Sequence, residues 1–292
     1  MGYFYAISCA FVWASSVVMF KSLGDDLNPI VMNLFKNVLA LIFLIPTYYL
    51  FEGHLLFDVP YNDHIILLAS GLIGIGFADA LVLKSITLIG ATRFAVVECL
   101  YSPLIILISI FVLNESLNLV QSLGIVLVLA AVGVVIFKKV EDKLSPKDFK
   151  LGVTLGVLGM LAMAVGIVAA KPAIERTPLI YAVTIRMAAG VFGSVLMLFF
   201  VDRKASEFKR LFNNSRWWML ISASMLSAYI SMILWVAGFK YVGASIASAL
   251  NQTSTIFTVL MAWIFLKEKM TVPKLTGVTL AICGVLIITL NR

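Results

Sequence analysis

The sequence predicts an all-α integral membrane protein whose ten transmembrane helices form two inverted five-helix repeats around a central cavity. Three observations predict this fold: the composition, the apolar runs, and a self-similarity between the two halves of the chain. Of the 292 residues, 62% are hydrophobic and only 13% are charged, whereas a soluble domain carries about 25% charged residues. The apolar runs are continuous rather than alternating, which excludes a β-barrel.

The apolar runs are close to the length that crosses a bilayer core, about twenty residues. Short gaps separate most of them, so consecutive helices should be antiparallel neighbours. The first run has no basic leader and no cleavage site, so we expect it to be a span and not a signal peptide. The expected spans are 2–21, 30–50, 64–83, 91–113, 118–137, 151–171, 180–201, 217–237, 243–266 and 274–290. The longest polar gaps are 51–63, 138–150 and 202–216.

The two halves of the chain match each other at two offsets. At an offset of 150 residues Lys36 falls on Arg186, and at an offset of 153 residues Glu98 falls on Asn251. Five helices per copy is an odd number, so the copies should enter the membrane from opposite sides, with a substrate site between them near the midplane. We expect a first repeat at 1–137, a linker loop at 138–150 and a second repeat at 151–292.

Loop charges predict an orientation. Sixteen lysines and arginines lie in or beside the odd-numbered gaps, and four lie in the even-numbered gaps and at the termini. Basic loops face the cytoplasm, so both termini should face outward. The net charge of +7 is accounted for by these loops, and we do not expect nucleic acid as a partner.

Several motifs resemble one known family. The opening WASSVVMFKSL, which contains Trp13, the paired GA-x(6)-[EN] helices, and the segments LNESL and LKEKM are similar to those of EamA-type transporters in the drug/metabolite transporter superfamily. The resemblance implies a ten-helix carrier with a cavity lined mainly by helices 1, 3, 4, 6, 8 and 9. It also implies cytoplasmic termini, opposite to the loop charges, and substrates such as amino acids, other small metabolites, nucleotide sugars or drugs.

The sharpest candidate for a substrate or coupling site is Glu98. It lies well inside the fourth span, where a charge is costly unless it faces a cavity or a partner. It could bind an amino group or a coupling proton, since burial favours the neutral form of a carboxyl group; a packing role is the alternative. Its repeat counterpart begins a polar cluster formed by Asn251, Gln252, Thr253 and Ser254.

Other charged residues lie within or near the spans. Lys36 and Arg186 are expected either to snorkel to the headgroups, or to contact an anion or carboxylate, or to form a gate ion pair with an acid on a neighbouring helix. Arg93 is also considered as a gate or charge partner. Asp79 could line the cavity or lie at the membrane interface near Lys84.

Proline and aromatic residues complete the predicted site. Pro103 should kink the fourth span and free a backbone carbonyl near Tyr101 and Ser102, which could face the cavity. Three aromatic residues could line the cavity or pack at interfaces: Trp13, Tyr229 and Trp235.

The remaining features are expected to be structural. Glu115 and Glu268 occupy equivalent helix ends and should cap the following helix or pair with loop lysines. Glycines should mark close helix packing: Gly74, Gly76, Gly156 and Gly159. The three cysteines should behave as small apolar residues with no metal or disulfide role: Cys9, Cys99 and Cys283.

Together these features predict a carrier of small metabolites in the plasma membrane. We expect a monomeric exporter that works by alternating access and has no cofactor and no metal. The enzyme motifs HExxH, GxSxG and Walker A are absent from the sequence, which argues against an intramembrane lipid-modifying enzyme. A lipid flippase or scramblase is a second candidate, and a channel or receptor is a third.

Overall fold

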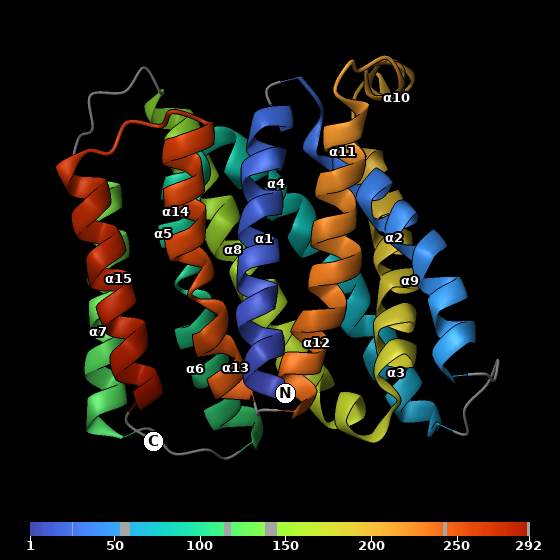
Figure 1. Cartoon of the computed structure of the whole chain (residues 1–292), viewed down its shortest axis with the longest axis horizontal. Helices are drawn as coiled ribbons and strands as arrows, with labels where there is room; N and C mark the ends of the chain where they lie inside the picture. Colours follow the sequence, from blue (N-terminus) through green and yellow to red (C-terminus); the bar gives the residue numbers. More distant parts are fainter. Residues whose placement is uncertain (25, 53–58, 114–117, 138–144, 242–243, 291–292) are drawn as a thin grey trace.

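The protein is a bundle of helices in the computed structural model shown in Figure 1. The structure describes the whole chain except residues 25, 53–58, 114–117, 138–144, 242–243 and 291–292, and the described part contains no strand. Its elements are α1 (Gly2–Gly24), α2 (Pro29–Glu52), α3 (Tyr61–Gly71), η1 (Leu72–Phe77), α4 (Ala78–Ile89), α5 (Ala91–Glu98), α6 (Tyr101–Leu113), α7 (Leu119–Phe137), α8 (Pro146–Arg176), α9 (Leu179–Met197), η2 (Leu198–Phe200), α10 (Lys204–Phe212), α11 (Trp217–Ser224), η3 (Met225–Ile230), α12 (Ser231–Tyr241), α13 (Ala244–Asn251), α14 (Ser254–Phe265) and α15 (Val272–Leu290).

Seven helical stretches of the described chain are long and apolar enough to cross a membrane. They are Gly2–Gly24, Pro29–Glu52, Tyr61–Ile89, Ala91–Val112, Pro146–Arg176, Leu179–Phe200 and Trp217–Tyr241. Three shorter apolar helices, Ser122–Ala131, Ser254–Phe265 and Leu275–Gly284, fall within the other expected spans. The chain is therefore a multi-pass membrane protein.

The outer surface of the bundle is apolar. Large side chains such as Phe4, Phe43, Phe111, Phe192 and Trp263 are exposed on five different helices. Exposed apolar area of this extent is a liability in water, but lipid tails cover such faces without cost. The exposed residues therefore define the faces that contact the bilayer.

The helices run between two ends of the bundle (Figure 1), with α1 beginning and α15 ending at the same end. Helix α10 lies at the opposite end, across the direction of the other helices. Helices α7 and α15 pack against each other at one edge. They approach so closely that a Cβ atom on Gly284 would lie 2.7 Å from the carbonyl oxygen of Gly124.

Two of the long helices contain a π-helical turn, η1 and η3. A π-helical turn holds an extra residue and disturbs the regular ladder of helical hydrogen bonds. The side chain of Asn33, on α2, donates to the carbonyl oxygen of Gly76 in η1 at 3.0 Å. It also donates to Ser194 Oγ on α9 at 3.0 Å. This amide therefore joins α2 to η1 and α9.

Two further spans are interrupted near their middle. Helix α5 ends at Glu98 and α6 begins at Tyr101, and α13 ends at Asn251 before α14 begins at Ser254. The sequence predicted a kink at Pro103; the structure has a break instead, with Pro103 in the first turn of α6. That position tolerates proline because the missing N–H has no helical acceptor there.

Most of the selected glycines mark close helix contacts, as predicted. Gly76 is one of them, since a Cβ atom there would lie 2.8 Å from the Cα of Gly193. Cβ atoms on Gly156 and Gly159 would also come within 3.0 Å of neighbouring side chains. Gly74 also lies at a helix contact, since a Cβ atom on Gly166 would lie 3.6 Å from its Cα. On the side where its own Cβ would point, which borders the cavity, no atom is closer than 3.9 Å.

The predicted gaps need two corrections. Helix α8 begins at Pro146, capped by Ser145, so part of the expected linker is helical. The gap 202–216 contains α10, a short polar helix that an analysis based on apolar runs cannot detect. Glu115 and residues 138–144 of the linker lie outside the described residues.

Candidate functional site

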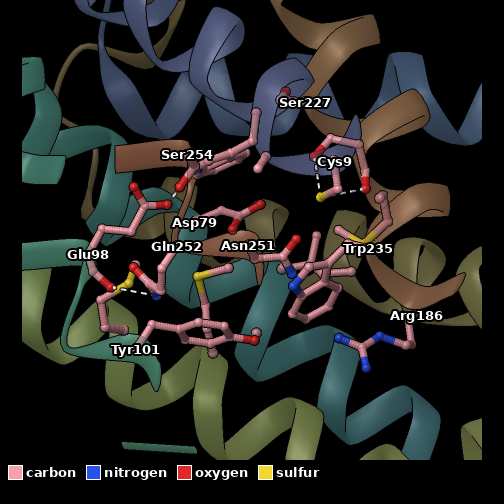
Figure 2. Close-up of a pocket in the computed structure, with 18 residues that line it drawn as sticks. Cys9, Asp79, Glu98, Tyr101, Arg186, Ser227, Trp235, Asn251, Gln252 and Ser254 are labelled. Atoms are coloured by element: carbon pink, nitrogen blue, oxygen red, sulfur yellow. Dashed lines mark hydrogen bonds between the residues drawn. The ribbon is translucent and has the colours of Figure 1, made fainter. Parts of the chain in front are cut away.

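A cavity lies inside the bundle and is lined from both halves of the chain (Figure 2). About 760 Å³ of space in and around it is not filled by atoms, and this figure includes open solvent. Its lining residues are Cys9, Ala10, Trp13, Gly74, Ile75, Asp79, Glu98, Tyr101, Met160, Met163, Arg186, Ser227, Ser231, Met232, Trp235, Asn251, Gln252 and Ser254.

Glu98 closes one side of this cavity from the last turn of α5. Its side chain is buried, and Oε1 accepts a hydrogen bond from Trp13 Nε1 at 2.5 Å. Oε2 has no hydrogen-bond partner among the described residues. Glu98 therefore offers one free carboxylate oxygen to whatever enters the cavity.

Three residues of the polar cluster predicted opposite Glu98 line the same cavity, at the break between α13 and α14: Asn251, Gln252 and Ser254. Thr253 instead donates to the backbone carbonyl of Leu250 at 2.7 Å. Gln252 Nε2 lies 3.4 Å from the backbone carbonyl of Glu98, which is a long hydrogen bond. This carbonyl lies at the helix break, close to where the sequence predicted a freed one. Within the described structure both amide atoms of Asn251 and the Gln252 Oε1 atom have no partner. Ser254 completes the cluster.

Besides Ser254, three of the predicted aromatic and hydroxyl residues line the cavity, and two do not. Trp13, Tyr101 and Trp235 are lining residues, and the rings of Tyr101 and Trp235 are 6.5 Å apart. Ser102 instead lies 3.5 Å from Ser248 Oγ, between α6 and α13. Tyr229 instead bonds to Thr47 on α2 at 2.6 Å. The sequence could not show which face of each helix is turned to the cavity.

Lys36 and Asp79 form a buried ion pair, with Lys36 Nζ 2.5 Å from Asp79 Oδ2. The two side chains are only 3% and 7% exposed, so neither reaches the headgroups. The structure thus excludes snorkelling of Lys36 and an interfacial position for Asp79. The reason is that the third span continues to Ile89, which places Asp79 deeper in the bundle than the sequence suggested.

Arg186 lies in α9 and is 1% exposed, so it does not snorkel either. Its guanidinium carbon lies 5.4 Å from the centre of the Trp235 ring, a cation–π arrangement. Its Nε and Nη1 atoms have no hydrogen-bond partner, and it forms no ion pair with any described residue. The helix that carries Arg186 is not among those the family resemblance implied for the lining.

Two further charged residues, Arg93 and Glu268, are not among the residues that line the cavity. The guanidinium carbon of Arg93 lies 5.5 Å from the centre of the Phe149 ring. Glu268 accepts hydrogen bonds from the backbone N–H groups of Ala91 at 2.9 Å and Thr92 at 3.3 Å. It therefore caps α5, a helix that the sequence did not suggest as its partner. The turn before α5 needs Gly90, whose φ is +84°.

The cavity also contains residues that the sequence analysis missed or undervalued. Met160, Met163 and Met232 are apolar residues within apolar runs, so no local signal distinguishes them from core. Cys9 was expected to act as a small apolar residue, but its Sγ lies 3.4 Å from Ser231 Oγ beside the cavity. Among the described residues no group of three or more His, Cys, Asp or Glu side chains is arranged to hold a metal.

A multi-pass helical bundle with an internal cavity that buried charged side chains line from both halves of the chain is the architecture expected of a membrane transporter. The chain matches the EamA-like transporter family over residues 1–137 and 150–290, and it belongs to that family.

Individual relatives agree with this assignment. The chain is 23% identical to an uncharacterized transporter of Methanothermobacter thermautotrophicus, over 99% of this chain and 86% of that protein. It is 27% identical over 140 residues to an uncharacterized protein of Methanocaldococcus jannaschii, which covers 48% of this chain and 97% of that protein. A solved structure titled "Crystal structure of protein" has the same fold, with a TM-score of 0.73, 16% identity, and coverage of 99% of this chain and 96% of the other.

Proposed function

We propose that this protein is a secondary carrier that exports small polar or amphipathic metabolites, amino acids or related solutes and also drugs, by alternating access. The observation that carries the proposal is the buried cavity, which combines free polar atoms of Glu98, Asn251 and Arg186 with aromatic walls. Free polar atoms buried in a membrane protein are costly, so their retention favours a role in binding a solute. One chain lines the cavity on every side, which favours a monomer.

The proposed architecture is ten helices in two inverted repeats, 1–137 and 151–292, joined by the linker 138–150. Several irregularities recur at the predicted offset of 153 residues and support it. The π-helical turn at Leu72–Phe77 recurs at Met225–Ile230, and the helix start at Ala91 recurs at Ala244. The half-length relative from Methanocaldococcus jannaschii is also what a duplicated unit would produce.

Alternating access needs contacts that open and close at the two ends of the bundle, and the structure offers candidates. At one end Arg176 donates two hydrogen bonds to Asp63, at 2.9 and 2.6 Å, joining α8 to α3. At the other end Arg216 pairs with Asp26, and Glu268 caps α5. We propose that these sets of contacts break in turn as the cavity changes sides.

We place the protein in the plasma membrane, and its orientation can be decided directly. The basic gaps put the end that carries α10 in the cytoplasm, whereas the family resemblance puts the termini there. Labelling a single cysteine introduced next to Met1 with an impermeant maleimide in intact cells distinguishes the two. Labelling in intact cells supports the loop charges, and labelling only after lysis supports the family orientation.

The function is tested by counterflow of radiolabelled solutes in proteoliposomes, with a panel of amino acids, nucleosides, sugar phosphates and cationic drugs. Glu98→Gln is compared with the wild type across pH 5 to 8, and Arg210→Gln on the exposed α10 is the matched control. We expect exchange of one solute class, with a pH dependence that Glu98→Gln alters. Scrambling of labelled phospholipid without exchange of any solute would instead support a scramblase.

A further inference from the structure

The charges around the cavity do not all find partners within the protein. Four charged side chains are buried there: Lys36 and Arg186 are cations, and Asp79 and Glu98 are acids. Lys36 and Asp79 neutralise each other at 2.5 Å. Asp79 also attracts Arg186 electrostatically, but its carboxylate is already bonded to Lys36. Arg186 and Glu98 are left as one cation and one acid without an ion-pair partner in the described structure.

The two halves of the chain explain why Arg186 lacks an acid. Arg186 occupies the position equivalent to Lys36, at the offset of 150 residues. At the offset of 153 residues, the position equivalent to Asp79 is Met232, an uncharged residue that lines the same cavity. The second half has therefore kept the cation and lost its acid.

Glu98 shows the opposite asymmetry. Its counterpart in the second half is Asn251, a neutral amide, and no base contacts the free Oε2 atom. The first half thus carries an extra acid and the second half an extra cation, while the cavity as a whole stays electrically balanced.

These two charges are held apart instead of pairing with each other. Figure 2 shows Glu98 and Arg186 on opposite sides of the cavity, with Tyr101, Gln252 and Asn251 between them. The guanidinium carbon lies 5.4 Å from the centre of the Trp235 ring, a cation–π contact that leaves its donors available. The Nε and Nη1 donors remain without acceptors. They lie on different edges of the guanidinium, and each edge, completed by Nη2, matches a carboxylate.

We propose that the cavity binds a zwitterion, with its carboxylate on Arg186 and its ammonium group on Glu98 Oε2. This inference deepens the proposed carrier function and rests on it for the act of transport, but not for binding. A zwitterion satisfies both charges at once, whereas a simple cation leaves Arg186 without a counter-charge and a simple anion leaves Glu98 without one. Buried charges are costly when unpaired, so this ligand chemistry fits the cavity best.

The other walls narrow the class of zwitterion. Met160, Met163 and Ile75 offer an apolar surface, which suits an aliphatic or aromatic side chain. The unpartnered amides of Asn251 and Gln252 lie between the two charged subsites in Figure 2 and can bond to the polar atoms of the ligand. Amino acids with apolar side chains meet all of these requirements.

The test measures binding to the purified protein in detergent by the shift in melting temperature, which a ligand of the folded state raises. The probes are leucine, phenylalanine, β-alanine and γ-aminobutyrate, so that the spacing between the two charges varies. Each binding zwitterion is compared with its amide, which lacks the carboxylate, and with its deamino acid, which lacks the ammonium group. We expect both analogues to bind about 30-fold or more weakly, because each leaves one buried charge unpaired.

The variants assign each charge to its residue. In Arg186→Gln the affinity for the amide should equal that for the amino acid within about threefold. In Glu98→Gln the affinity for the deamino acid should equal that for the amino acid within about threefold. Arg186→Lys keeps a positive charge, so it should still bind the amino acid more tightly than the amide. This variant distinguishes loss of the charge from a failure to fold. Met232→Asp should give Arg186 an internal acid, lower amino-acid affinity by about 30-fold or more, and keep or raise the melting temperature without ligand. Arg210→Gln, far from the cavity, should match the wild type.

Binding and transport can fail separately. The inference is overturned if only cations or only anions bind, or if the analogues are still distinguished in Arg186→Gln and Glu98→Gln. If zwitterions bind with the expected pattern but show no counterflow, the inference stands and the carrier function fails. If another solute shows counterflow that neither Arg186→Gln nor Met232→Asp affects, the carrier function stands and the zwitterion site is refuted.

Discussion

Removal of one partner of the buried Lys36–Asp79 pair should destabilise the fold more than removal of both. In Asp79→Leu the ammonium group of Lys36 would remain at a site only 3% exposed to solvent, with no other hydrogen-bond acceptor within the described structure. An uncompensated buried charge of this kind costs about 3–5 kcal/mol. The free energy of unfolding should fall by that amount.

The double variant Lys36→Met with Asp79→Leu should recover most of the loss. Replacing a buried ion pair with apolar side chains of similar volume is often neutral or even stabilising. The thermodynamic cycle over the two single variants and the double variant should therefore give a coupling energy of about 3 kcal/mol or more.

Reversible unfolding in mixed detergent micelles measures these free energies, with tryptophan fluorescence as the signal. The matched control is the exposed Arg210–Glu207 pair on α10, for which the coupling should be below about 1 kcal/mol. A loss below about 1 kcal/mol in Asp79→Leu would refute the reasoning. A double variant no more stable than Asp79→Leu would also refute it, because the cost of Asp79→Leu would then not come from the unpaired charge of Lys36.

Two further predictions concern contacts between helices. Glu268→Gln removes the charged acceptor that bonds to the N–H of Ala91 at 2.9 Å, so unfolding in the same micelles should become easier by about 0.5–2 kcal/mol; an unchanged stability would mean that the cap contributes nothing. Gly76→Val should cost about 1–3 kcal/mol, because its Cβ would lie 2.8 Å from the backbone of Gly193. Gly74→Ala is its control, with no atom closer than 3.9 Å, and an equal loss in both variants would contradict the explanation.

The general class of the protein was predictable from sequence because hydropathy is a local property. The length and hydropathy of each apolar run are enough to predict a membrane span. The class of protein and most of the spans could therefore be predicted without any knowledge of contacts. The duplication was equally visible, since it needs only a comparison of the chain with itself. Glu98 and Asn251 stood out for the same reason: a polar residue within an apolar run is conspicuous whatever its neighbours are.

Only the tertiary structure decided which side chains meet. Lys36 and Asp79 are 43 positions apart, and Glu268 caps a helix that begins 177 positions earlier. Such partners depend on which helix faces are in contact, and π-helical turns and helix breaks rotate those faces in ways that an apolar run does not reveal. For the same reason the sequence left open whether Tyr229 lines the cavity or packs elsewhere, and the structure turns it towards Thr47. The sequence by itself determined a multi-pass membrane protein with two self-similar halves and an acid within an apolar run. Helix packing decided that this acid and Arg186 face one cavity, because only packing fixes which charges are compensated.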